Sequence, residues 1–299
     1  MRLLNALILI MSFICYSMAS TQTKTIEHPF LWKVEKGEQH FYLFGTMHLA
    51  DPLLQTLPKA LKEAIDKSDI VRTEIPLDIK TQLKASTMMM RDDNQTLKDI
   101  LSNKLYNRTQ KYLQGINPKL TLASFEHIKI WAVATIVSMI ENQLKYPFLQ
   151  AIDDVIYNYA KEQKKDIGGV ETLDEQLGVM DSFSFQEQIL ELESTLDYLD
   201  KETDFGYEMK KLYISGNSKK LMDFINKSMF QMPKYTKLEE KFMQRLLYNR
   251  NIRMAQRLER IVTQNPHKKS LFAFGVMHFL GKKSIIEILK SHGYRVQRL

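Results

Sequence analysis

The chain has 299 residues, of which 44% are hydrophobic and 26% are charged, as in an ordinary globular protein. Its net charge is +7, and many lysines occur as scattered pairs without interleaved aromatic residues. This pattern favours a solvated surface over a nucleic-acid interface, although it allows weak attraction to an anionic membrane surface.

Residues 1–19 have the pattern of a secretory signal peptide. Arg2 is the only charge there, an apolar run follows from Leu3 to Tyr16, and small residues at 17 and 19 stand where signal peptidase reads. We expect cleavage near Ala19 and a periplasmic or secreted protein; an uncleaved anchor is the alternative.

Cys15, within this segment, is the only cysteine of the chain. The mature chain would therefore have no disulfide and no thiol, which excludes thiol peptidases and cysteine-rich zinc sites. A chain without cysteine suits an oxidising compartment.

The first mature elements form a strand–loop–helix–strand unit. Apolar alternation around a turn at 36–38 predicts a hairpin over 31–46, and Gly45-x-x-His48 follows it. Helical periodicity covers 58–68, and a short strand over 69–76 ends at a proline. The glycine would allow a tight turn that points His48 back over the sheet edge.

The rest of the chain alternates between helical stretches and strands. Residues 80–165 and 184–262 read as helical, with a strand over 165–171 between them. The C-terminus repeats the first unit: a strand over 270–274, Gly275-x-x-His278, a helix over 282–291 and a final strand. We predict a single α/β domain over 20–299, with strand–Gly-x-x-His–helix units at both ends of a central sheet and a large helical insertion over about 80–165.

Four chemically capable side chains follow predicted strands: His48, His278, Glu74 and Glu171. Ligands collect at the carboxyl ends of parallel strands, so these side chains are expected to converge. Two imidazoles and two carboxylates suit a first-row divalent metal with a position left for water. The alternative for each glutamate is a solvated strand-end carboxylate.

Arg250 breaks the apolar stripe of a long predicted helix over 237–262, between Leu247 and Met254. A core-facing arginine needs a partner, so it forms either a structural ion pair with a buried glutamate or a fixed cation that stabilises an oxyanion. Glu175 and Gln176, one turn beyond Glu171, are candidates for orienting a ligand.

Several common enzyme motifs are absent from the sequence. It has no Gly-x-Ser-x-Gly elbow, His-Glu-x-x-His, phosphate-binding loop or dinucleotide fingerprint. The sequence therefore disfavours serine hydrolases, standard zinc peptidases, nucleotide-triphosphate enzymes and Rossmann dehydrogenases.

The motifs resemble those of the TraB/PrgY/GumN family, relatives of the Tiki metalloproteases. The resemblance rests on "LFGTMHLADP", "GGVETLDEQLGVMDSF", "NRNIRMAQRLERI" and "FAFGVMHFLGKKSIIEILKSHGYRVQRL". It implies an α/β fold like that of erythromycin esterase-like and haem-binding ChaN-like proteins. It also implies a metalloprotease that favours manganese or cobalt and uses both Gly-x-x-His histidines, here His48 and His278. Glu74, Glu171, Arg250 and Asn251 fall at polar positions that the family repeats.

We therefore predict an exported metal-dependent hydrolase, most simply a peptidase acting on peptides or proteins. The metal would be held by His48, His278 and at least one of Glu74 and Glu171, with manganese or cobalt favoured and zinc or iron as alternatives. The remaining glutamate would accept the proton of water, and Arg250 would stabilise the oxyanion. A non-catalytic peptide- or haem-binding protein and an esterase are the alternatives.

Overall fold

The computed structural model describes residues 26–201 and 205–299; the predicted signal peptide lies outside them. The strands are β1 Leu31–Lys36, β2 Gln39–Thr46, β3 Ile70–Thr73, β4 Asp166–Gly169, β5 Ser270–Gly275 and β6 Arg295–Arg298. The α-helices are α1 Lys59–Asp66, α2 Ile79–Met89, α3 Leu97–Ile100, α4 Asn103–Ile116, α5 Ile130–Lys145, α6 Ile152–Glu162, α7 Leu173–Asp181, α8 Phe185–Lys201, α9 Phe205–Ile214, α10 Ser218–Ser228, α11 Thr236–Phe242, α12 Asn249–Gln264 and α13 Ile285–Ser291. Short 3₁₀ turns are η1 Pro52–Leu54, η2 Leu122–Phe125, η3 Pro233–Tyr235 and η5 Val276–Phe279, and η4 Met243–Tyr248 is a π-helix.

The six strands form one mixed sheet in the order β4-β3-β5-β2-β1-β6. The neighbours β4, β3, β5 and β2 are parallel, whereas β1 runs antiparallel to both β2 and β6. The predicted hairpin is present, because β1 pairs with β2 across a turn in which Gly37 has a φ of 59°. The predicted α/β class is confirmed, and four carboxyl ends of parallel strands lie along one edge.

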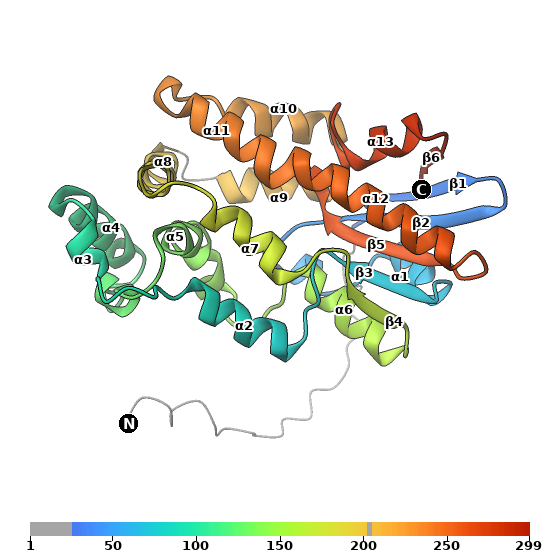
Figure 1. The fold of residues 1–299 in the computed structure, drawn as a ribbon, viewed down its shortest axis with the longest axis horizontal. Helices are drawn as coiled ribbons and strands as arrows, with labels where there is room; N and C mark the ends of the chain where they lie inside the picture. The colour runs from blue at the N-terminus through green and yellow to red at the C-terminus, as the bar shows by residue number, and fades with distance from the viewer. Residues whose placement is uncertain (1–25, 202–204) are drawn as a thin grey trace.

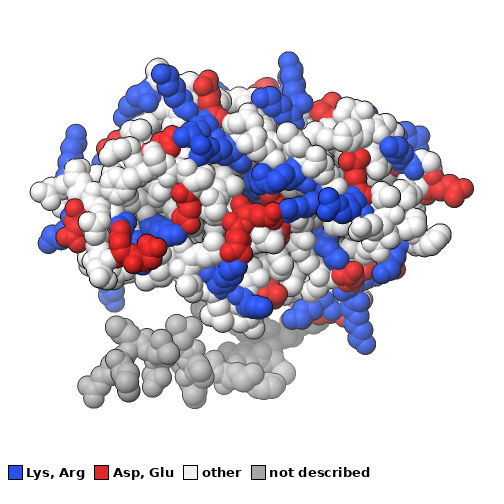
Figure 2. Space-filling view, viewed as in Figure 1, with Lys and Arg blue, Asp and Glu red and all other residues white. Residues whose placement is uncertain are grey.

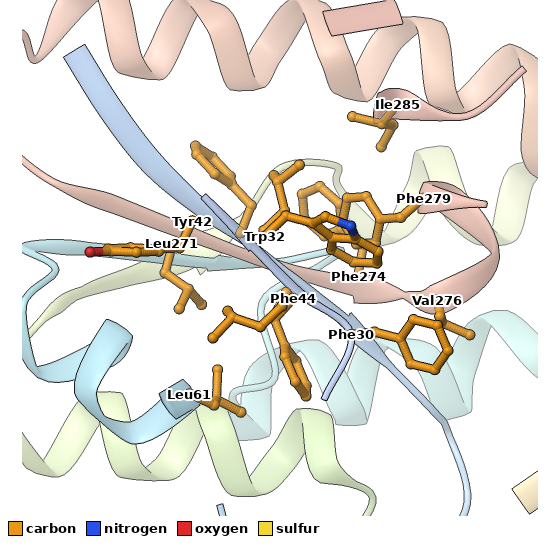
Figure 3. Packing of buried hydrophobic residues seen from close by; sticks show 14 of the residues in the cluster. Phe30, Trp32, Tyr42, Phe44, Leu61, Leu271, Phe274, Val276, Phe279 and Ile285 are labelled. Atoms are coloured by element: carbon orange, nitrogen blue, oxygen red, sulfur yellow. The ribbon is translucent and has the colours of Figure 1, made fainter. Parts of the chain in front are cut away.

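The main core encloses the sheet from both sides. Figure 3 shows Leu61 of α1 and Ile285 of α13 on opposite sides of the strands. Phe44, Leu271 and Phe274 are fully buried because β2 and β5 are central strands with both faces covered. The continuous apolar runs of these two strands are thus the signature of a buried parallel pair.

A second core belongs to the helices α3, α4, α5 and α8, which lie at the other end of the molecule from the sheet (Figure 1). Leu105, Val133 and Leu192 are among its buried residues. No helix in the described part of the chain is long and apolar enough to span a bilayer.

Glu191 of α8 is the weak point of this helical part. Its Oε2 atom is buried and has no hydrogen-bond partner among the described residues, and burial raises the pKa of this carboxyl from 4.5 to about 8. The folded state therefore loses stability as the pH rises from about 4.5 to about 8, because the charged carboxylate is desolvated when the protein is folded and solvated when it is unfolded.

Replacing Glu191 with glutamine should stabilise the protein at pH 7 by about 2 kcal/mol, because the amide carries no charge to desolvate. The gain should disappear near pH 4, where the carboxyl is protonated in both states. Urea unfolding at the two pH values measures it; an equal gain at both would contradict the explanation.

The predicted single helix over 237–262 is interrupted in the structure. Its N-terminal half is α11, and the wider η4 turn separates it from α12, with the Asn249 N–H bonded to Gln244 O. The Nη1 of Arg250 donates to Leu246 O at 3.1 Å and so links the first turn of α12 to η4. Heptad spacing could not reveal this interruption, because the apolar stripe continues across it.

Candidate active site

The parallel strands bring three of the four predicted side chains together at the carboxyl edge of the sheet. His48 follows β2, Glu74 follows β3, and His278 lies in the η5 turn after β5. Glu171 follows β4 at the edge of the sheet; its backbone N–H donates to Glu74 O at 2.7 Å, and its side chain is linked to that of Glu74 through Arg250.

Glu74 is the centre of the cluster. Its Oε1 accepts the Gly275 N–H at 2.8 Å and lies 3.6 Å from Nε2 of His48 and 3.6 Å from Nε2 of His278. Its Oε2 accepts from Arg250 Nη2 at 2.6 Å and from Gln176 Nε2 at 2.8 Å. Burial would raise the pKa of Glu74, but the two histidines and Arg250 outweigh it and hold that pKa well below its usual range.

His48 is held by an acidic partner on α6. Its Nδ1 lies 2.9 Å from Asp153 Oδ2, and Asp153 Oδ1 accepts from Thr46 Oγ1 at 2.6 Å. An ionised carboxylate only accepts, so Nδ1 donates and Nε2 is left to face Glu74. The charge on Asp153 raises the pKa of His48 well above its usual value. With 56% of its side chain exposed, His48 is the accessible member of the cluster.

His278 is the buried member, with 5% of its side chain exposed. Its Nδ1 lies 2.6 Å from Asn251 Oδ1, and the amide nitrogen of Asn251 donates to Lys283 O at 2.8 Å. That second bond fixes Oδ1 as the acceptor, so Nδ1 of His278 donates and its Nε2 faces Glu74. Burial lowers the pKa of His278 to about 4, which keeps the imidazole neutral at pH 7.

Glu171 and Arg250 form a buried ion pair in contact with this cluster. Glu171 Oε2 accepts from Arg250 Nε at 2.9 Å and from Nη2 at 2.7 Å, while Oε1 lies 3.2 Å from Arg253 Nη2. Both oxygens of Glu171 are thus bonded to arginine, and the Glu171 side chain is inaccessible to solvent. The geometry favours the structural ion pair, one of the two roles that the sequence left open for Arg250, and leaves Glu171 without contact to either histidine nitrogen.

The donor types at the cluster fit a divalent transition ion, because two imidazole Nε2 atoms and one carboxylate oxygen face one another and both Nδ1 atoms are fixed from behind. Among residues 26–201 and 205–299, however, no group of three or more His, Cys, Asp or Glu side chains stands close enough to hold a metal ion. The two histidines and Glu74 would therefore have to move closer together to bind a metal ion.

The two glycines before the histidines serve close packing. Gly275 has a φ of −48°, which any residue adopts, but a Cβ there would lie 3.2 Å from Glu74 Oε1 and 3.2 Å from His48 Nε2. A Cβ on Gly45 would lie 2.9 Å from Val276 Cγ2. The expectation that these glycines enable a tight turn is wrong for this reason: what they allow is close approach.

Replacing Gly275 with alanine should push Glu74 and His48 apart by a few tenths of an ångström and lower kcat/KM at least about tenfold. Gly178→Ala is the matched control, since a Cβ at that helical glycine meets nothing within 4 Å. Equal turnover by the two variants would show that the spacing at Gly275 does not matter.

Sequence reasoning missed Asp153 and Thr46. Asp153 lies in a helical stretch beside Asp154, and no spacing distinguishes the buried carboxylate from its neighbour. The polar Thr46 at the end of an apolar strand, two residues before His48, was the available signal. Gln176, considered as an orienting residue, contacts Glu74, and Glu175 instead pairs with Arg257 at the surface.

Comparison with known proteins agrees with the motifs. The chain is 26% identical to "Metalloprotease TIKI1" of Danio rerio (90% of this chain, 62% of the relative), 26% to that of Xenopus tropicalis (89% and 61%) and 24% to that of Homo sapiens (90% and 61%). It thus spans about three fifths of the length of these relatives. No solved structure matches it. The model of the TraB/PrgY/gumN family matches residues 30–298, and the chain belongs to that family.

Proposed function

We propose that this protein is an exported, metal-dependent peptidase. The proposal is supported by the similarity to proteins named metalloproteases over about nine tenths of the chain. The observation that carries it is the meeting of His48, Glu74 and His278 at one point, with both histidines turned to present Nε2. The substrate would be a peptide or protein.

The ion would be held by Nε2 of His48, Nε2 of His278 and Oε1 of Glu74, and manganese or cobalt is favoured over zinc or iron. When bound, such an ion supplies Lewis-acid polarisation of a carbonyl and a water of lowered pKa. Cation binding has to displace the proton that Asp153 stabilises on His48, so affinity should fall as the pH is lowered.

The surrounding residues hold this donor set in place. Arg250, Gln176 and the Gly275 N–H orient Glu74, while Asp153 and Asn251 fix the two rings. We propose that Glu171 acts by anchoring Arg250. That Arg250 stabilises an oxyanion stays a prediction. It requires a nitrogen of Arg250 to give up one of its hydrogen bonds to Glu74, Glu171 or Leu246 O.

The test is turnover of matched peptide and ester substrates by the mature chain, stripped with a chelator and then given Mn²⁺, Co²⁺, Zn²⁺ or Fe²⁺. The proposal expects peptide cleavage that chelation abolishes and one of the ions restores. Cleavage of esters alone would favour the esterase. Peptide or haem binding that survives chelation, with no turnover, would favour the sequestering protein.

A further inference from the structure

A surface hollow of about 460 Å³ lies between α7 and the η4–α12 segment. Figure 2 shows acidic side chains gathered near the centre of this face, over α7, with basic ones beside them. The charged and capping residues that line the hollow, together with the one glycine, are Asp174, Glu175, Gly178, Ser182, Arg245 and Arg253.

The two carboxylates of the hollow are already paired with cations that do not line it. Asp174 is ion-paired with Lys84 of α2. Glu175 Oε2 lies 2.8 Å from Arg257 Nη1, and Arg257 lowers the pKa of Glu175 to about 2. The negative charges of Asp174 and Glu175 are therefore balanced by residues outside the lining of the hollow.

The two arginines of the hollow are not matched in the same way. Arg245 has no carboxylate partner among the described residues: its Nη1 donates to Ser182 O at 2.9 Å and to Ser182 Oγ at 3.0 Å. Its guanidinium carbon also lies over the Phe183 ring, 5.1 Å from the ring centre, in a cation–π contact. Arg253 shares Glu171 with Arg250 and keeps 38% of its side chain exposed.

We propose that this hollow binds a carboxylate of the peptide substrate, supplied by an acidic side chain. A planar guanidinium suits a carboxylate because its parallel N–H groups can donate to both oxygens. The hollow is also linked to the cluster by shared ion pairs, from Arg253 through Glu171 and Arg250 to Glu74. The inference rests on the proposed peptidase function and deepens it by naming a substrate class.

The experiment measures binding of two fluorescent peptide pools to the full mature chain by anisotropy, with and without Mn²⁺. Both pools are random except at one position, which is glutamate in the first and glutamine in the second. The wild type should bind the glutamate pool about tenfold more tightly, as expected for a charge-assisted hydrogen bond.

Two independent substitutions should remove this preference. Arg245→Gln deletes the unpaired cation, and Gly178→Phe fills the hollow from a position where a Cβ meets nothing within 4 Å. Gly178→Ala leaves the space open and should keep the preference. Thermal unfolding confirms that each variant is folded.

Equal binding of the two pools, or a preference that survives both substitutions, would overturn the proposal. Free glutarate is the competing probe: binding that depends on Arg245, without a difference between the pools, would show that the hollow takes free carboxylates instead. Because binding is measured, a chain that prefers the glutamate pool but cleaves nothing would overturn only the peptidase function. Cleavage without the preference would overturn only this inference.

Discussion

Replacing Glu74 with glutamine is expected to lower kcat/KM for peptide hydrolysis at least about a thousandfold. The amide keeps the shape of the side chain but removes the negative charge that faces Nε2 of both histidines. It also removes the carboxylate that Arg250 and the Gly275 N–H orient. Steady-state kinetics of the manganese- or cobalt-loaded chain measures the loss.

The matched control is Glu287→Gln. Glu287 pairs with Lys290 on α13, keeps 46% of its side chain exposed, and does not touch the cluster. That variant should retain turnover within about threefold of the wild type, since exposed ion pairs are worth at most about 1 kcal/mol. Comparable losses in the two variants would contradict a special role for Glu74.

Replacing Arg250 with leucine is expected to destabilise the fold by about 3 to 5 kcal/mol at pH 7. Arg250 lies between two buried carboxylates, Glu74 at 2.6 Å and Glu171 at 2.7 Å, and leucine leaves both charges without this partner. The deficit should shrink once the pH falls below about 4.5, the ordinary pKa of a glutamate, because Glu74 then loses the stabilisation that its depressed pKa reflects. Urea unfolding at pH 7 and at about pH 3.5 measures both effects.

Adding Glu171→Gln to the leucine variant should recover part of the stability, since one of the two buried carboxylates that lose Arg250 then carries no charge. Arg257→Gln is the surface control and should cost about 1 kcal/mol or less. A leucine variant as stable as the wild type would show that the buried ion pair contributes nothing to folding.

The strands and the meeting of three site residues could be predicted because each leaves a local mark. Buried parallel strands appear as continuous apolar runs, as in Phe41–Phe44 and residues 271–274. A histidine four residues after such a run lies at the sheet edge by topology alone. His48, Glu74 and His278 could therefore be placed together from the sequence.

The partners of those residues could not be found in the same way. Asp153 reaches His48 across more than a hundred positions of chain, and its helix has no local feature that depends on this contact. Glu171 follows a strand as Glu74 does, yet β4 is the edge strand, and Arg250 and Arg253 take both of its oxygens. Strand-end position thus predicts the edge of the sheet on which a side chain lies, while the helices packed above decide what it contacts.

The proposal that His48 and His278 hold a metal ion is tested most directly by elemental analysis of the chain from Ser20 onward. It is purified without a histidine tag, beside the His48→Ala/His278→Ala double variant. We expect about one equivalent of manganese, cobalt, iron or zinc in the wild type and none in the folded variant. A wild type that takes up none of these ions, even after reconstitution with each, would contradict the claim.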